Sequence, residues 1–139
     1  MSPTRNAPSR ADAFLHYPGS ATVVSLLADK WTIPVIHSLA GGTRRTGELR
    51  RTLTGVSQKM LTQTLRALEE HGLVERKVYP VVPPRVEYGL TALGESINEP
   101  LAHMCEWIAR NGALLERGRT RQRAARRARA HRMPDLVEP

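Results

Sequence analysis

Apolar residues recur at helical spacing in the middle of the chain. Leu61, Leu65 and Leu68 lie at positions i, i+4 and i+7, so they form one stripe along a helix. Ser57 is a favourable N-cap before this stripe, and Gly72 is a favourable terminator after it. The pattern predicts a helix over about residues 57–71. At ~100° per residue, its opposite face carries polar and cationic side chains: Lys59, Thr62, Gln63 and Arg66.

A shorter helix is predicted just before it. Thr46 is suited to cap this helix, Glu48 suits its positive N-terminal end, and Leu49 and Leu53 lie four residues apart on one face. Gly55 then permits the positive φ that a tight turn often needs. Together the two segments predict a helix-turn-helix.

A hairpin is predicted between residues 74 and 90. Apolar Val74, Val78, Val86, Tyr88 and Leu90 alternate with charged Glu75, Lys77, Arg85 and Glu87, as expected of half-buried strands. Arg76 interrupts the alternation, so we place it near an edge. Three prolines stiffen the tip between the strands, and Arg85 follows them directly.

The order of these elements predicts a winged helix-turn-helix with flanking dimerisation helices, a mainly α fold with a small β-hairpin. Amide, hydroxyl and cationic side chains near a helix N-terminus can reach base edges and phosphates of DNA. The hairpin over residues 74–90, which is the wing of this fold, carries an arginine after a rigid tip and can contact the DNA backbone or the minor groove. The alternative for the helix is an ordinary solvated face, and the alternative for the hairpin is a solvated turn with an incidental cation. The candidate DNA contacts are Arg45, Thr46, Ser57, Gln58, Lys59, Thr62, Gln63, Arg66, Arg76, Lys77 and Arg85.

A second apolar stripe follows the hairpin. Because Pro100 interrupts it and Asn98 can cap a new start, we expect a short helix from Thr91 and a longer one from about Glu99. Earlier in the chain, Pro34 should lie in the first turn of a helix that begins near Thr32. A small winged-helix core cannot bury the whole stripe, so the same stripe of a second copy is the expected partner, with packing onto its own core as the alternative. The stripe consists of Leu93, Ile97, Leu101, Met104, Ile108 and Leu115.

The positive charge is concentrated near the C-terminus. Residues 117–132 hold eight arginines and no acid, so the rest of the chain is neutral within the total of +8. This segment is expected to extend the preceding helix until Pro134, either as an extra phosphate contact or as a solvated, frayed extension. We therefore divide the chain into a mobile arm or short helix over 1–18, a winged-helix domain with dimerisation helices over 19–116, and an arginine-rich tail over 117–139.

The sequence from about residue 20 to 110 resembles the HxlR-type regulators, a MarR-like winged-helix group of bacterial transcription factors. The resemblance implies a homodimeric repressor of a pseudo-palindromic operator on double-stranded DNA, with a short helix near Ala11–Tyr17 that can cross to the partner subunit. It rests on Leu26-Leu27, Lys30-Trp31, Gly42 to Arg51, Val56-Ser57, the leucine stripe, Gly72-Leu73-Val74, Arg76, Val78-Tyr79-Pro80, Pro83 to Tyr88, Leu90-Thr91, Gly94 and Glu106-Trp107.

Two departures from the family pattern bear on regulation. Family members usually carry an aromatic residue where this chain has Thr46. Many carry a cysteine just before a proline ahead of the first helix, where this chain has His16-Tyr17-Pro18. A small molecule is then the expected signal, and its candidate site is lined by Trp31, His37, Met104 and Trp107. Cys105 is expected to be an apolar packing residue, with a redox sensor as the alternative.

The remaining chemistry argues against an enzyme. The five histidines form no ligand cluster with Cys105, and we find neither a glycine-rich phosphate loop nor a Ser/His/Asp pattern, so no cofactor is expected. We find no apolar segment long enough to span a membrane and no secretory signal, and a single cysteine fits a reducing compartment. We therefore expect a cytoplasmic protein that does not bind a membrane. Two alternative functions stay open. The arginine tail suits a nucleoid-type binder, and the neutral remainder suits a protein-interaction module.

Overall fold

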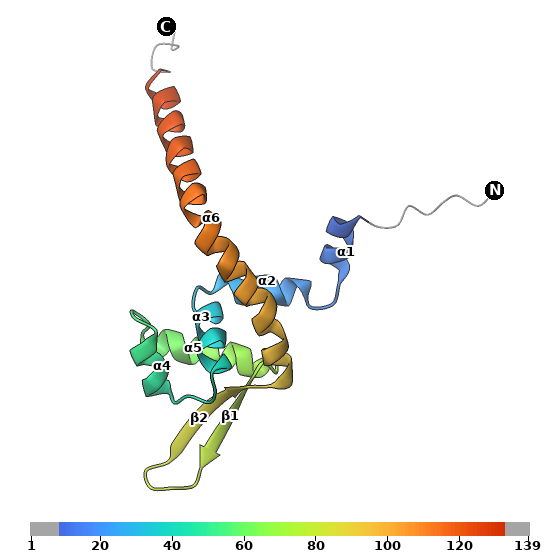
Figure 1. Ribbon diagram of the computed structural model, residues 1–139, viewed down its shortest axis with the longest axis vertical. Coiled ribbons are helices and arrows are strands. Elements are labelled where there is room, and N and C mark those ends of the chain that lie inside the picture. Colours follow the sequence, from blue (N-terminus) through green and yellow to red (C-terminus); the bar gives the residue numbers. More distant parts are fainter. Residues whose placement is uncertain (1–8, 133–139) are drawn as a thin grey trace, which may run out of the picture. The chain divides into compact units, whose positions relative to one another are not determined.

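The computed structural model describes residues 9–132 and is mainly α-helical with one small β-hairpin, which confirms the predicted fold class (Figure 1). It divides into two compact units, which meet between Asn98 and Glu99. The elements are α1 (Arg10–His16), α2 (Ser20–Ala28), α3 (Thr32–Ala40), α4 (Thr46–Thr52), α5 (Gln58–Glu70), β1 (Val74–Tyr79), β2 (Arg85–Leu90) and α6 (Ala92–His131).

The core of the first unit is built where α3 packs against α4, α5 and β2. The three leucines predicted to form a stripe on α5 are each at most 1% exposed, and Leu49 of α4 is completely buried. Burying a leucine side chain stabilises the fold by roughly 1.5–3 kcal/mol, so this packing fixes α4 and α5 as one helix-turn-helix. α3 begins at Thr32 with Pro34 in its first turn, as the sequence predicts.

The ends of α5 are set by its flanking residues. The Ser57 hydroxyl accepts a hydrogen bond from the Met60 backbone N–H at 3.1 Å. At the other end Gly72 has φ +71°, and the Leu73 N–H donates to the Leu68 carbonyl at 2.9 Å. Together with the bond from the Gly72 N–H to the Glu69 carbonyl at 3.0 Å, this bond forms a Schellman cap, which requires a residue that tolerates the left-handed region. Both predicted ends of the helix are therefore confirmed.

The predicted cap of α4 is wrong. Arg45, in an extended backbone conformation, is the N-cap residue, and Thr46 is the first helical residue without a capping bond. The reason lies in the preceding residue. Arg44 pairs with Tyr88 of β2 through two backbone hydrogen bonds of 2.9 and 2.8 Å. This pairing keeps the chain extended up to Arg45 and lets the helix begin at Thr46, one residue earlier than a Thr46 cap requires.

The hairpin pairs antiparallel from Val74↔Leu90 to Tyr79↔Arg85. Its base is buried, since Val74 is 2% exposed and β1 packs against α5. The expected alternation is wrong beyond this base. All of β1 after Val74 is exposed, with Val78 at 55%, and on β2 the charged Glu87 is half-buried while Gly89 is the buried residue. The hairpin projects beyond the helices of the first unit (Figure 1), and the side chains at its tip are exposed.

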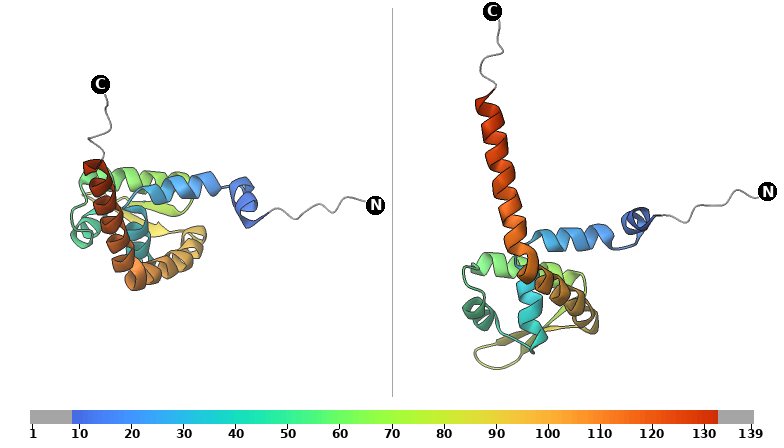
Figure 2. Two further views of the ribbon diagram at one scale, coloured as in Figure 1. Left: turned by 90° about the horizontal axis from the view of Figure 1, so that it is seen from above. Right: turned by 45° about the horizontal axis from the view of Figure 1, so that its top comes forward.

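The predicted break near Pro100 is also wrong, because α6 runs without interruption from Ala92 to His131 with Pro100 inside it (Figure 2). Asn98, the expected cap, instead places its Oδ1 2.7 Å from Nδ1 of His37. Pro100 removes one helical hydrogen bond, and the helix continues on both sides of it. The helical part of the predicted C-terminal extension is confirmed to His131, whereas Pro134 lies outside the described residues.

The N-terminal part of the first unit contains the short helix that the resemblance implies. α1 spans Arg10–His16 and α2 follows it after a short turn, while residues 1–8 of the predicted arm lie outside the described part. Among the helices described between residues 9 and 132, none is long and apolar enough to cross a membrane.

Candidate nucleic-acid interface

The outer face of α5 presents side chains that can contact DNA. Lys59, Gln63 and Arg66 are exposed, and Thr62 is half-buried beside them. The Gln58 side-chain amide donates to the Thr62 hydroxyl at 3.4 Å. Ser57, at the N-terminal end of the same face, is exposed and holds the helix cap. The periodicity therefore predicts correctly that Lys59, Gln63 and Arg66 face solvent, whereas Thr62 lies at the border of this face.

A buried hydroxyl that sequence reasoning missed ties α5 to the preceding helices. Thr64 is 1% exposed, and its hydroxyl lies 2.6 Å from Oδ2 of Asp29 and 3.0 Å from the Met60 carbonyl. The other carboxylate oxygen of Asp29 accepts from the Trp31 backbone N–H at 2.9 Å. Asp29 thus links the α2–α3 corner to the middle of α5. The sequence signal was a polar residue on the apolar stripe.

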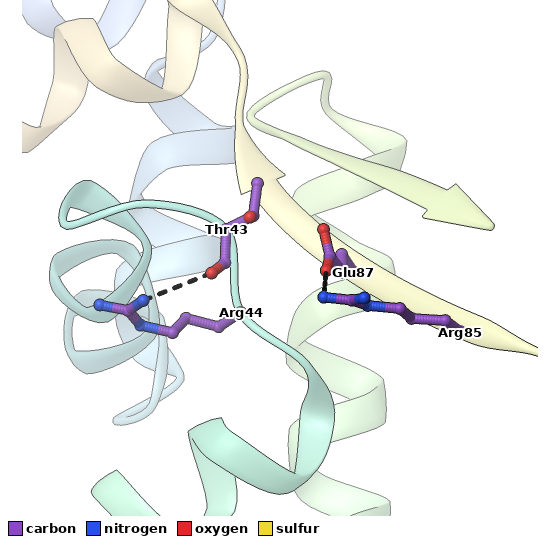
Figure 3. Close-up of polar contacts among 4 residues, drawn as sticks. All are labelled: Thr43, Arg44, Arg85 and Glu87. Carbon is purple, nitrogen blue, oxygen red and sulfur yellow. Dashed lines mark hydrogen bonds and ion pairs between the residues drawn. The ribbon is translucent and has the colours of Figure 1, made fainter. Parts of the chain in front are cut away.

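The wing cations are engaged by neighbouring side chains. Nη2 of Arg85 lies 2.8 Å from Oε1 of Glu87 (Figure 3). The Arg85 guanidinium also lies 5.8 Å from the centre of the Tyr79 ring. Lys77 pairs with Glu75 at 3.5 Å, and Arg76 is exposed on the same strand. Arg85 is therefore held along β2 with part of its charge compensated.

A groove of about 840 Å³ lies between the start of α4 and the tip of the wing. It brings together Arg45 and Arg85, which the sequence predicts as DNA contacts, with Arg51, which it missed. Glu48 is the one acid that lines it, so the groove has a net positive charge. The side chain of the preceding residue, Arg44, is not part of this groove; its Nη1 donates to the Thr43 carbonyl at 3.4 Å (Figure 3). A concave surface with three guanidinium groups is suited to binding phosphate.

The predicted dimerisation residues of α6 differ in exposure. Leu101 is 3% exposed, so it is already buried in the single chain, and Ile97 is half-buried. Leu93, Met104, Ile108 and Leu115 are exposed, together with Trp107 and Leu114 beside them.

The four predicted effector residues come from both units. In the first, Nε1 of Trp31 is buried without a hydrogen-bond partner in the described part of the chain, and His37 contacts Asn98. In the second, Met104 and Trp107 are exposed. A cavity of about 460 Å³ between α2, α3 and α5 is lined by other residues, including Asp29, Thr32 and His71.

The second unit places His103 beside two carboxylates. It lies 3.9 Å from Glu99 and 3.7 Å from Glu106, and Cys105 is half-buried on the same helix. Between residues 9 and 132, no three His, Cys, Asp or Glu side chains come together in a way that would hold a metal ion.

Comparison with known proteins assigns this helix-turn-helix and wing to a family. A model described as HxlR-like helix-turn-helix matches residues 26–115, which include every element from α3 to β2. The chain belongs to the HxlR-like family. Its members are transcriptional regulators and not enzymes, so the protein is a DNA-binding regulator of transcription.

Curated relatives and solved structures agree with the HxlR assignment. The HTH-type transcriptional regulator YtfH of Escherichia coli (strain K12) is 46% identical over 92 residues, which cover 66% of this chain and 73% of YtfH. YkvN of Bacillus subtilis (strain 168) is 46% identical over 89 residues, 64% of this chain and 75% of YkvN. The structure of the redox regulator HypR in its reduced form superposes with a TM-score of 0.66 at 35% identity, and covers 71% of this chain and 98% of HypR.

Proposed function

We propose that the protein is a homodimeric, sequence-specific repressor whose α5 enters the major groove of its operator. The observation that carries this proposal is the exposed polar face of α5, fixed by a buried stripe and two formed caps, in a chain of the HxlR-like family. An amide at position 63 and cations at positions 59 and 66 provide both base-reading and phosphate-binding groups.

The wing and the groove beside it supply contacts that do not depend on sequence. Arg45, Arg51 and Arg85 line one concave surface, and Arg76 and Lys77 lie on the outer strand of the hairpin. DNA phosphates compete with Glu87 for Arg85, because both offer anionic oxygens to the same guanidinium. These residues set the position of the duplex, whereas α5 reads it.

Exposed apolar side chains in both units support a homodimer. In the first unit, Phe14 and Leu15 of α1 and Val24 of α2 are 48%, 73% and 56% exposed. In the second, Ile108 and Leu115 are 49% and 61% exposed on one face of α6. A second copy would bury both groups in an isologous contact and present two α5 helices to major grooves ~34 Å apart. The operator is then pseudo-palindromic.

We propose that a small molecule, rather than a thiol near α1, releases the protein from DNA. HypR is a redox regulator by name, but this chain carries His16-Tyr17-Pro18 where many relatives have a cysteine before proline. The unpartnered Nε1 of Trp31 offers a hydrogen-bond donor to a ligand. A compound that saturates tryptophan quenching without changing operator affinity contradicts this scheme. A fall in affinity after diamide treatment would instead assign sensing to Cys105.

The test is a hydroxyl-radical footprint on the DNA upstream of the protein's own gene. Two protected patches on one face of the duplex, one helical turn apart, are the expected result. Uniform protection of all DNA with a steep salt dependence would favour the nucleoid-type alternative. No protection at any salt concentration would favour a protein-interaction module.

A further inference from the structure

The last part of α6 carries arginine on every side. Residues 117–132 are exposed and contain eight arginines, no acid and no apolar side chain larger than alanine. At ~100° per residue the arginines are distributed around the whole circumference of the helix. This segment therefore has no face that can pack against a protein core.

The arginines also repel one another. Arg117 and Arg121, Arg119 and Arg123, and Arg123 and Arg127 lie at i and i+4, where like charges destabilise a helix. Arg119 pairs with Glu116 at 3.9 Å, which compensates one of the eight charges. A polyanion along the helix would relieve this repulsion and favour the helical form.

The spacing of the charges suits a nucleic-acid backbone. The segment is about 24 Å long at 1.5 Å per residue, which matches roughly seven base pairs of duplex with two phosphates each. Guanidinium groups bind phosphate oxygens in pairs. A membrane-surface helix needs an apolar face, which this segment lacks.

We propose that residues 117–132 form a second DNA-binding element, which grips the phosphate backbone of duplex DNA without reading its sequence. The choice of duplex DNA as the polyanion rests on the proposed function. The element adds to affinity and its salt dependence, whereas sequence preference stays with α5. Because about four arginines lie on any one side of the helix, it makes about four phosphate contacts.

The test uses the full chain with Arg→Gln at all eight positions, and a charge-preserving control with Arg→Lys at the same positions. Affinities for the upstream DNA and for random duplex are measured from 50 to 200 mM salt. The Gln variant should lose affinity for both DNAs by the same factor. The slope of its log affinity against log salt concentration should be smaller by about 4 than that of wild type. Between 50 and 200 mM salt, wild type should therefore lose on the order of 10²-fold more affinity than the Gln variant. The Lys variant should stay within a few-fold of wild type. Circular dichroism checks that each variant keeps its helical fold.

Three results would overturn the proposal: an unchanged salt slope in the Gln variant, a loss confined to the upstream DNA, or a Lys variant as weak as the Gln variant. Arginine-dependent binding that is stronger to single-stranded RNA or to anionic phospholipid vesicles than to duplex DNA, at equal phosphate concentration, would also overturn it.

A third variant separates this proposal from the proposed function. This variant combines Lys59→Ala, Gln63→Ala and Arg66→Ala. It should lose the preference for the upstream DNA, while residues 117–132 should still bind random duplex in a salt-dependent way. If wild type shows no preference but the Gln variant still loses random binding, the proposed function fails and the second element stands. If preference is present and the Gln variant is unchanged, the second element alone fails.

Discussion

At the scale of single residues, the packing of α5 decides which of its side chains can reach DNA. Winding the chain at ~100° per residue predicts that Lys59, Gln63 and Arg66 face solvent, because the leucine stripe fixes the rotation of α5. The cap of α4 was predicted wrongly because the backbone pairing of Arg44 with Tyr88, 44 residues apart in the sequence, decides where that helix starts. Local sequence carries no signal for that contact.

Removing the Thr64 hydroxyl should loosen the attachment of α5. Thr64→Val deletes the donor to Asp29 and leaves a half-buried carboxylate with one hydrogen bond fewer, so the free energy of unfolding should fall by about 1–3 kcal/mol. Urea denaturation measures this change. Thr64→Ser keeps the hydroxyl and is the matched control. Equal stability of the Val and Ser variants would show that the Asp29 contact contributes nothing.

Gln63 and Arg85 should have different roles in DNA binding. Gln63→Ala removes a base-reading amide and should reduce the preference for operator over random DNA by about 1–3 kcal/mol. Arg85→Ala removes a cation of the groove and should weaken binding to all sequences alike. Fluorescence titrations with both DNAs distinguish the two effects. An equal loss on operator and random DNA for Gln63→Ala would contradict its assignment.

At the scale of elements, the order of helices and strands followed from sequence pattern, while their ends and continuity depended on tertiary contacts. Alternation located both strands, but it could not show that the tip of the hairpin extends beyond the core and leaves Val78 exposed. Pro100 and Asn98 together suggested a break in α6. The Asn98 side chain is instead engaged by His37, from a helix 61 residues earlier in the chain.

The first turn of α6 should tolerate no side chain at Gly94. A Cβ there would lie 2.0 Å from the Leu73 carbonyl oxygen, so Gly94→Ala should cost about 3 kcal/mol or more, or prevent folding. Gly118→Ala, in the same helix with open space around it, should instead gain about 0.5–1 kcal/mol. Thermal unfolding followed by circular dichroism compares the pair. A Gly94→Ala protein as stable as wild type would show that this approach is looser than described.

At the scale of the whole molecule, the sequence indicated both a DNA-binding unit and an apolar stripe larger than a small core can bury. The stripe was visible because its residues share one face of a helix. That Leu101 is buried while Ile108 and Leu115 are exposed could not be read from that periodicity, since all three occupy the same face. The exposed members are therefore the ones that we assign to the contact between subunits.

A charge on the exposed stripe should separate the subunits. The double variant Ile108→Glu and Leu115→Glu would place carboxylates in the proposed contact between subunits. Sedimentation velocity should then show a monomer. Operator affinity should fall by tenfold or more, because the two half-sites are then bound independently. Ala113→Glu lies ~150° around α6 from these two residues, on an exposed part of the helix, and should leave the oligomeric state and the operator affinity unchanged. A double variant that remains dimeric would rule out this stripe as the contact.

The central claim is that α5 reads a specific DNA sequence. The most direct measurement is the ratio of affinities for the DNA upstream of the protein's own gene and for random duplex, at ~150 mM salt, in wild type and in the Lys59→Ala, Gln63→Ala, Arg66→Ala variant. The account predicts a ratio of at least about 10³ for wild type, which falls close to one in the variant while the fold is retained. A high ratio that survives these three substitutions would contradict the assignment of sequence reading to α5.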